Sequence, residues 1–112
     1  MAVGRYRLFV GKDQQYYFSL KAPNGRVILQ SEGYKALAGA ENGIDSVRNH
    51  SSSMGNYELK TAKNGEFYFV LKAANHQVIG ASEMYITQQG AQEGLESVMA
   101  FAPSAEVDRE DE

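Results

Sequence analysis

An internal duplication constrains the fold of this 112-residue chain more than any other feature of its sequence. A shift of 51 positions aligns residues 6–50 with residues 57–101 without a gap, and about two in five aligned residues are identical. The clearest match joins YYFSLKAPNGRVILQSEGY at 16–34 to FYFVLKAANHQVIGASEMY at 67–85. Because two similar sequences adopt similar folds, we expect two equivalent units related by a pseudo-twofold axis.

Each copy begins with three segments that have the hydrophobic pattern of β-strands. Apolar and polar residues alternate with the period of two that a half-buried strand requires. Asn64-Gly65 is typical of a tight hairpin turn, and Pro23-Asn24-Gly25 also marks a turn. The predicted strands are 6–10, 16–21 and 26–31 in the first copy and 57–61, 67–72 and 77–82 in the second.

The hydrophobic period then changes from two to the 3.6 of a helix in both copies. The apolar stripe of the first helix is formed by Leu37, Ala40, Ile44 and Val47, and the counterparts are Gln88, Ala91, Leu95 and Val98. We predict amphipathic helices over about 36–49 and 87–100. Thr87 is suited to cap the second helix, Ala36 cannot cap the first, and Pro103 ends the second.

Three strands and a helix, written twice, predict an α+β fold with one antiparallel sheet and both helices packed on one face. One three-stranded unit with one helix makes a marginal core. We therefore expect a single domain over residues 1–105, made of repeats at about 5–53 and 54–105. The side chains expected in its core include Phe18, Phe69, Ile44 and Leu95.

Negative charge is concentrated in the C-terminal segment 106–112. This segment holds five acidic residues and one arginine, a net −4, so that residues 1–105 carry +1 of the total of −3. We expect the segment to be a disordered tail, because like charges repel and termini lack packing partners. A tail that folds over a basic patch is the alternative. The near-neutral body argues against strong non-specific nucleic-acid binding.

The repeated motif resembles that of a known family. NGEFYFVLKAANHQVIGASEMY, its counterpart YYFSLKAPNGRVILQSEGY and the following AGAENGIDSV are similar to the YegP-like family of small uncharacterised bacterial proteins, over about residues 5–102. The resemblance implies β-β-β-α-β units whose final strands are exchanged, hence a fourth strand around 54–57 and another around 104–107. It also implies a monomer that is an intrachain pseudo-dimer. It carries over no catalytic residue, cofactor or substrate.

Composition excludes several classes of chemistry. The chain has no cysteine, which removes disulfides, thiolate metal sites and cysteine nucleophiles. No apolar run approaches the roughly 20 residues of a membrane span, so no membrane partner is expected. Charges within the opening MAVGRYRLFVGKD argue against a cleaved targeting segment, and we expect a cytoplasmic protein.

The candidate catalytic residues have ordinary structural roles in this interpretation. His50 falls at a helix C-terminus, where a cation is favourable, and His76 falls in a turn. Ser31 and Ser82 each precede a glutamate, which does not activate a serine without a positioned base. We expect no enzyme, no catalytic residue, no metal site and no organic cofactor.

The sheet face turned away from the helices carries the candidate contact surface. Its predicted members are Tyr17, Lys21, Tyr68 and Lys72, with Ser19 and Val70 between them. Aromatic rings flanked by lysines serve single-strand nucleic-acid binders. Antiparallel sheets also carry tyrosine and lysine on a solvated face for propensity and solubility alone. A surface for a protein partner or for self-association is the third interpretation.

Three function classes therefore remain open. We favour a small non-catalytic binding or adaptor module whose partner is unidentified. Nucleic-acid binding through the open sheet face, to RNA or single strands, is the alternative, and an unrecognised enzyme is the third. Salt dependence distinguishes the first two, because counterion release makes nucleic-acid affinity fall steeply with salt.

Overall fold

The computed structural model describes residues 3–110 and contains seven strands, two α-helices and one short 3-10 helix. The first repeat forms β1 (Arg5–Val10), β2 (Tyr16–Lys21), β3 (Val27–Gln30) and α1 (Leu37–His50). The 3-10 helix η1 (Met54–Asn56) leads into the second repeat, which forms β4 (Tyr57–Thr61), β5 (Phe67–Lys72), β6 (Val78–Ala81) and α2 (Gln88–Phe101). The last strand of the described residues is β7 (Glu106–Glu110). The six predicted strands and both predicted helices are confirmed.

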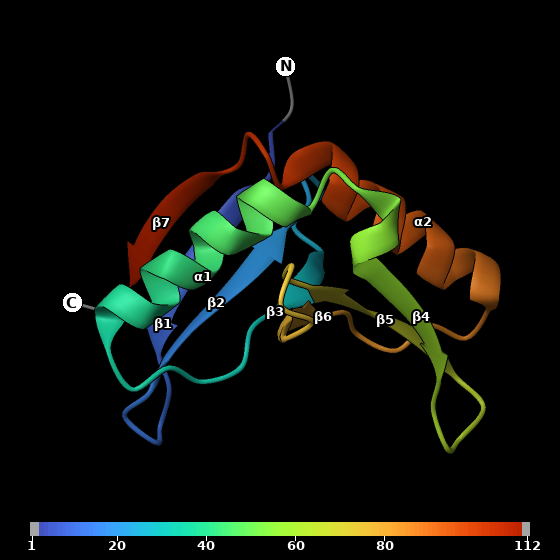
Figure 1. The fold of residues 1–112 in the computed structure, drawn as a ribbon, viewed down its shortest axis with the longest axis horizontal. Coiled ribbons are helices and arrows are strands. Elements are labelled where there is room, and N and C mark those ends of the chain that lie inside the picture. Colours follow the sequence, from blue (N-terminus) through green and yellow to red (C-terminus); the bar gives the residue numbers. More distant parts are fainter. Residues whose placement is uncertain (1–2, 111–112) are drawn as a thin grey trace.

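All seven strands belong to one sheet, in the order β4-β5-β6-β3-β2-β1-β7. The repeats meet where β3 pairs with β6, and the pairing residues are Gln30 and Ala81. Since Ala81 is the counterpart of Gln30 in the second repeat, the pseudo-twofold axis passes through this pair. The sheet is strongly curved, and both helices lie on the same side of it (Figure 1). The α+β class with two helices on one face is confirmed.

The final strand corrects two expectations. Residues 106–110 of the predicted disordered tail form β7, and β7 runs parallel to β1, so the sheet is mixed rather than wholly antiparallel. The strand begins two residues later than the 104–107 predicted from the family resemblance. Like charges do not prevent the strand because Glu106, Asp108 and Glu110 share one face of it and lie against Arg5 and Arg7 of β1. Residues 111–112 of the predicted tail lie outside the described residues.

The other predicted fourth strand, around 54–57, is also corrected. Residues Met54–Asn56 form a turn of 3-10 helix, and the strand starts only at Tyr57. Tyr57 donates its backbone N–H to the Met54 carbonyl, which closes that turn. The strand after α1 is therefore β4 itself, which pairs with β5 of its own repeat, whereas the strand after α2 is an additional one.

The core lies between the sheet and the two helices. Phe18 and Phe69 are fully buried, and Ile44 and Leu95 are 2% and 3% exposed, as the hydrophobic pattern predicted. The helices approach the sheet closely at Gly43 and Gly94. A Cβ added at Gly43 would stand 2.6 Å from the Tyr34 hydroxyl and 2.8 Å from the Phe18 ring, so glycine is required there.

Two equivalent hydrogen bonds join each repeat to the other. Tyr6 of β1 donates its hydroxyl to the carbonyl of Ala102, the residue that follows α2, at 2.7 Å. Its counterpart Tyr57 donates to the carbonyl of Ser51, which follows α1, at 2.8 Å. Each tyrosine therefore bonds the residue that follows the other repeat's helix. Both repeats contribute to fixing the helix ends.

Candidate functional site: the open face of the sheet

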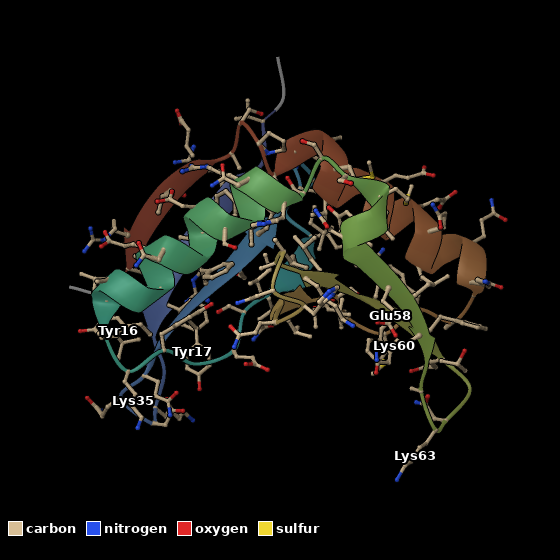
Figure 2. All side chains as sticks on the ribbon, in the orientation of Figure 1. Tyr16, Tyr17, Lys35, Glu58, Lys60 and Lys63 are labelled. Atoms are coloured by element: carbon tan, nitrogen blue, oxygen red, sulfur yellow. The ribbon has the colours of Figure 1, made fainter. Side chains whose placement is uncertain are left out.

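The four predicted contact residues lie on strands β2 and β5, and all four are half-buried. Tyr17 and Lys21 flank the buried Phe18 and Leu20 along β2, so the alternation of a strand turns them away from the helices. Tyr68 and Lys72 are placed in the same way on β5. Figure 2 labels Tyr17 near the start of β2.

The two Tyr–Lys pairs are not neighbours. Strands β3 and β6 separate β2 from β5, which puts the pairs about 14 Å apart at the usual spacing of strands. The intervening residues Ser19 and Val70 are only 4% and 6% exposed. The equivalent strands that the duplication brings side by side are thus β3 and β6. The open face therefore consists of two half-sites, one around each Tyr–Lys pair, and the side chains between them are almost fully buried.

Around Tyr17 the open face carries a small aromatic cluster. The Tyr17 ring stacks on Phe9 of β1 with 5.7 Å between the centroids, and the Arg7 guanidinium lies 4.4 Å from the Phe9 ring centroid. The Tyr17 hydroxyl donates to Asp13 at 2.5 Å. This hydrogen bond lowers the pKa of the Asp13 carboxyl and raises the pKa of the Tyr17 phenol. The ring is therefore held in place by its own chain.

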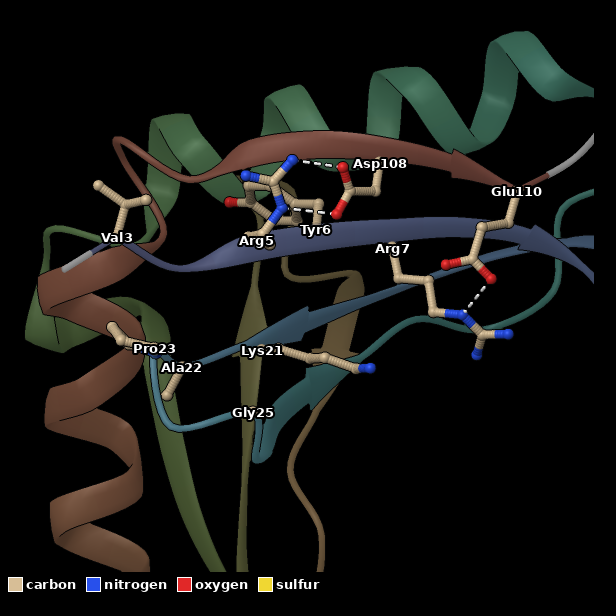
Figure 3. Close-up of a pocket in the computed structure, with 10 residues that line it drawn as sticks. All are labelled: Val3, Arg5, Tyr6, Arg7, Lys21, Ala22, Pro23, Gly25, Asp108 and Glu110. Carbon is tan, nitrogen blue, oxygen red and sulfur yellow. Dashed lines mark hydrogen bonds and ion pairs between the residues drawn. The ribbon is translucent and has the colours of Figure 1, made fainter.

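Beside this cluster, the acidic side chains of β7 meet the basic side chains of β1. Arg5 bonds both carboxylate oxygens of Asp108 and also reaches Glu106 at 3.3 Å, and Arg7 bonds Glu110 at 2.8 Å. The hydrogen bond from Arg5 lowers the pKa of Asp108. Arg5, Arg7, Asp108 and Glu110 line a cavity on this face, and Lys21 lines it too (Figure 3). The positive charge of this half-site is largely balanced within the chain.

The second half-site has a different arrangement of charge. Glu58 of β4 accepts a hydrogen bond from Lys72 at 2.6 Å and lies 3.4 Å from Lys60. The bond from Lys72, assisted by Lys60, lowers the pKa of Glu58. Lys72, one of the four predicted contact residues, is thus paired with a carboxylate of its own repeat.

The serines and His50 bind backbone groups. Ser31 Oγ accepts from the Phe18 N–H at 2.9 Å and donates to the Glu32 carbonyl at 2.8 Å, and Ser82 makes the same two bonds in the second repeat. His50 Nδ1 donates to the Ser46 carbonyl at 2.8 Å, while Nε2 accepts from the Ala74 N–H at 3.3 Å. His50 lies in the last turn of α1, the helix C-terminus at which the sequence placed it.

The basic row on β1, formed by Arg5 and Arg7, was not predicted from the sequence, although a tail folded over a basic patch was the alternative given for the acidic segment that forms β7. A signal for both was present: Arg5 and Arg7 alternate with buried residues, and Glu106, Asp108 and Glu110 have the same period of two. Among residues 3–110, no three His, Asp or Glu side chains are grouped so that they could hold a metal ion. Neither helix in this range combines the length and hydrophobicity needed to cross a bilayer.

The fold and the duplicated sequence define a tandem-repeat α+β protein, and comparison with known proteins assigns its family. The model of the domain of unknown function DUF1508 matches twice, at residues 12–58 and 62–108, so the chain belongs to this family. Each matched unit runs from the second strand of a repeat through its helix into the strand that follows.

Relatives and solved structures agree with this assignment. The UPF0339 protein MS1092 of Mannheimia succiniciproducens is 52% identical over 96% of this chain and 95% of its own length. The UPF0339 protein YegP of Escherichia coli K12 is 51% identical over 93% of this chain and 94% of its own. The solution structure of E. coli yegP, a protein of unknown function, matches with a TM-score of 0.92 and 49% identity, covering 97% of this chain and 94% of that one. The UPF0339 protein SO3888 of Shewanella oneidensis matches with a TM-score of 0.90, 43% identity and coverages of 97% and 92%. The family resemblance is confirmed, and the relatives carry no assigned activity.

Proposed function

We propose that this protein is a non-catalytic binding module that contacts another protein through the open face of its sheet. The observation that carries the proposal is the charge balance of that face. Arg5, Arg7 and Lys72 are each paired with a carboxylate of the same chain. A face with half-buried tyrosines and compensated charge is suited to a protein surface, because aromatic and arginine side chains are enriched in such contacts.

The same charge balance disfavours nucleic acid as the ligand. Binding to a phosphate backbone draws its affinity from cations that replace the counterions of the phosphates. On this face the carboxylates of Asp108 and Glu110 already occupy the guanidinium groups of Arg5 and Arg7. A phosphate would have to displace them.

The non-catalytic part of the proposal rests on the candidate nucleophiles and base. A serine nucleophile needs a free hydroxyl and a neighbouring base. Ser31 and Ser82 instead hold the backbone at the end of a strand, and both ring nitrogens of His50 are engaged with backbone groups. These side chains serve the fold.

The test is capture from cytoplasmic extract, the compartment that the sequence predicts, with the double variant Tyr17→Ser/Tyr68→Ser. The control is Asn42→Ala/Glu93→Ala, which changes an exposed counterpart pair on the helices. We expect the wild type and the control to retain a common protein that the tyrosine variant loses. The variant should stay folded and lose roughly 1 kcal/mol of stability, because the stack of Tyr17 on Phe9 is removed.

Two outcomes contradict this proposal. Retention of the same protein by the tyrosine variant would remove the open face as the contact surface. Recovery of nucleic acid, released steeply as salt rises, would favour the alternative function.

A further inference from the structure

The two outer edges of the sheet differ although the repeats that form them are equivalent. The outer edge of β1 is covered by β7, and the outer edge of its counterpart β4 has no strand beside it among residues 3–110. Figure 1 shows β7 and β4 at opposite ends of the molecule. A sheet edge with unpaired backbone groups is a place where another strand can add.

The apolar side chains of β1 and β4 differ in burial as the two edges differ in pairing. Tyr6 and Leu8 of β1 are fully buried, whereas their counterparts Tyr57 and Leu59 of β4 are only half-buried. Val107 of β7 packs against the core beside β1, and nothing equivalent in residues 3–110 covers β4. A strand added to β4 would therefore bury apolar surface as well as satisfy hydrogen bonds.

The hairpin register shows which backbone groups of β4 point outward. Ala62 donates its N–H to the Glu66 carbonyl at 2.7 Å, so Ala62 faces β5. Since hydrogen-bonded and non-bonded pairs alternate along an antiparallel ladder, Lys60 and Glu58 also bond toward β5. Leu59 and Thr61 then turn both backbone groups outward. Tyr57 offers its carbonyl only, because its N–H is bonded to Met54.

The side chains indicate what kind of strand fits. An acidic strand like β7 does not fit, because the positions of Arg5 and Arg7 are taken by Asn56 and Glu58 in the second repeat. Along β4 the acid Glu58 and the base Lys60 stand on either side of Leu59 (Figure 2). This order of charge is complementary to itself when the strand is reversed. Within one chain Glu58 bonds Lys72 at 2.6 Å and lies 3.4 Å from Lys60, so Lys60 of a second copy would replace only the longer of these two contacts.

We propose that β4 pairs antiparallel with β4 of a second copy of this chain, in the register that places Leu59 opposite Leu59. In this register Glu58 of each copy stands opposite Lys60 of the other, in the non-hydrogen-bonded pairs whose side chains come closest. Registers centred on Glu58 or on Lys60 put like charges opposite each other. The result is an isologous twofold contact with the helices of both copies on one side of a continuous sheet.

The proposed dimer differs from the monomer expected from the sequence. The sequence did not show that β7 covers the edge of β1 and leaves the edge of β4 without a strand among residues 3–110. The contact consists mainly of two five-residue strands. Stable complexes bury about 1,200–2,000 Å² in total, so a contact of this size gives a weak dimer that forms with rising concentration.

The experiment is sedimentation velocity of the full chain from micromolar to about millimolar concentration, with amide NMR spectra of the same samples. The wild type should dimerise, and the amide signals of Leu59 and Thr61 should shift with concentration. Glu58→Lys alone and Lys60→Glu alone should each raise the dissociation constant about tenfold or more, because each places like charges opposite each other. An equimolar mixture of the two variants should form a heterodimer, since their charges are complementary.

Two further variants separate the edge from general charge effects. Lys63→Glu makes the same charge change as Lys60→Glu, but in the exposed turn beyond β4, and should leave dimerisation unchanged. Thr61→Pro removes an outward N–H that the monomer does not use, so it should abolish the dimer while the monomer still folds. A wild type that stays monomeric at millimolar concentration overturns the proposal. So does a dimer that all of these variants form equally well. Neither result bears on the open-face function, which is tested separately through Tyr17 and Tyr68.

Discussion

At the scale of single residues, the duplication supplies its own comparisons, because the same backbone position often carries two different side chains. The turn between β2 and β3 has Gly25 at a φ of 86°, and the equivalent turn between β5 and β6 has His76 at a φ of 68°. Residues other than glycine adopt this left-handed region at a cost of about 1–2 kcal/mol. His76 therefore carries strain that Gly25 does not.

We expect His76→Gly to stabilise the protein, by at most about 1 kcal/mol because glycine also gains freedom in the unfolded chain. Gly25→Ala should destabilise it by about 1–2 kcal/mol, and the cost is conformational because no atom lies within 4 Å of the added Cβ. Chemical denaturation measures both changes. Equal stability of His76→Gly and wild type would show that His76 carries no strain in this turn.

A second residue-scale prediction concerns alkaline pH. Burial raises the pKa of the Tyr6 phenol above its ordinary value of about 10. An acid whose folded pKa is raised contributes stability that is complete below its unfolded pKa and is lost as pH rises through the folded value. Stability should therefore fall above about pH 10, and it should fall less steeply in Tyr6→Phe.

The Tyr6→Phe variant should also lose about 0.5–1.5 kcal/mol at neutral pH, because the Ala102 carbonyl loses its hydrogen bond. Urea denaturation from pH 7 to 11 measures both effects. Tyr68→Phe, a change on the open face, is the control. Parallel stability curves for Tyr6→Phe and the wild type would contradict a role for Tyr6 ionisation.

At the scale of elements, β7 is held differently from the other strands. It is the only parallel strand within residues 3–110, and one of its faces is anchored by ion pairs with Arg5 and Arg7. Its other face contributes Val107 to the edge of the core. Because exposed ion pairs are weak individually, the strand depends on several acting together.

We expect acid to loosen β7 before the rest of the sheet. Arg5 lowers the pKa of Asp108, so this carboxylate contributes stability that is present above its unfolded pKa of 3.8 and is lost as pH falls through the lower folded value. Hydrogen exchange should show reduced protection of the β7 amides near pH 3 while β5 stays protected. Asp108→Asn should show the same loss at neutral pH. Unchanged protection of β7 at pH 3 would mean that Val107 and the backbone hydrogen bonds to β1 hold the strand without the ion pairs.

At the scale of the whole molecule, the repeats interlock through Tyr6 and Tyr57 and share one continuous sheet. We propose on this basis that they form one cooperative domain rather than two. Each repeat uses the other to hold the end of its helix, and a single repeat would also expose the β3 edge that β6 covers. A repeat alone has too small a core to fold comfortably.

A chain of residues 1–53 should therefore be unfolded, or should dimerise so that a second copy takes the place of the second repeat. Circular dichroism with sedimentation measures this, and the full chain is the control. A monomeric fragment that melts cooperatively would show that the repeats are independent domains.

Local pattern was enough to predict the elements and the main core. The change of period from two to 3.6 placed the three strands and the helix of each repeat, and the apolar positions predicted the burial of Phe18 and Leu95. Thr87 caps α2 as predicted, accepting from the Gly90 N–H at 2.9 Å, and Ala36 makes no side-chain cap. These features depend on neighbours a few residues apart, so the sequence carries them directly.

Tertiary structure alone decided the partners of the strands. Arg5 and Asp108 are 103 positions apart, and the acidic segment becomes a strand only because β1 presents basic side chains and an open edge to it. The distance between the two Tyr–Lys pairs likewise depends on β3 and β6 meeting at the axis. The edge of β4 has no strand beside it within residues 3–110 for the same reason, since this range supplies β7 for only one of the two equivalent edges. Pairing between distant segments has no period along the chain, and for that reason the sequence by itself determined the parts of this protein but not how its two edges differ.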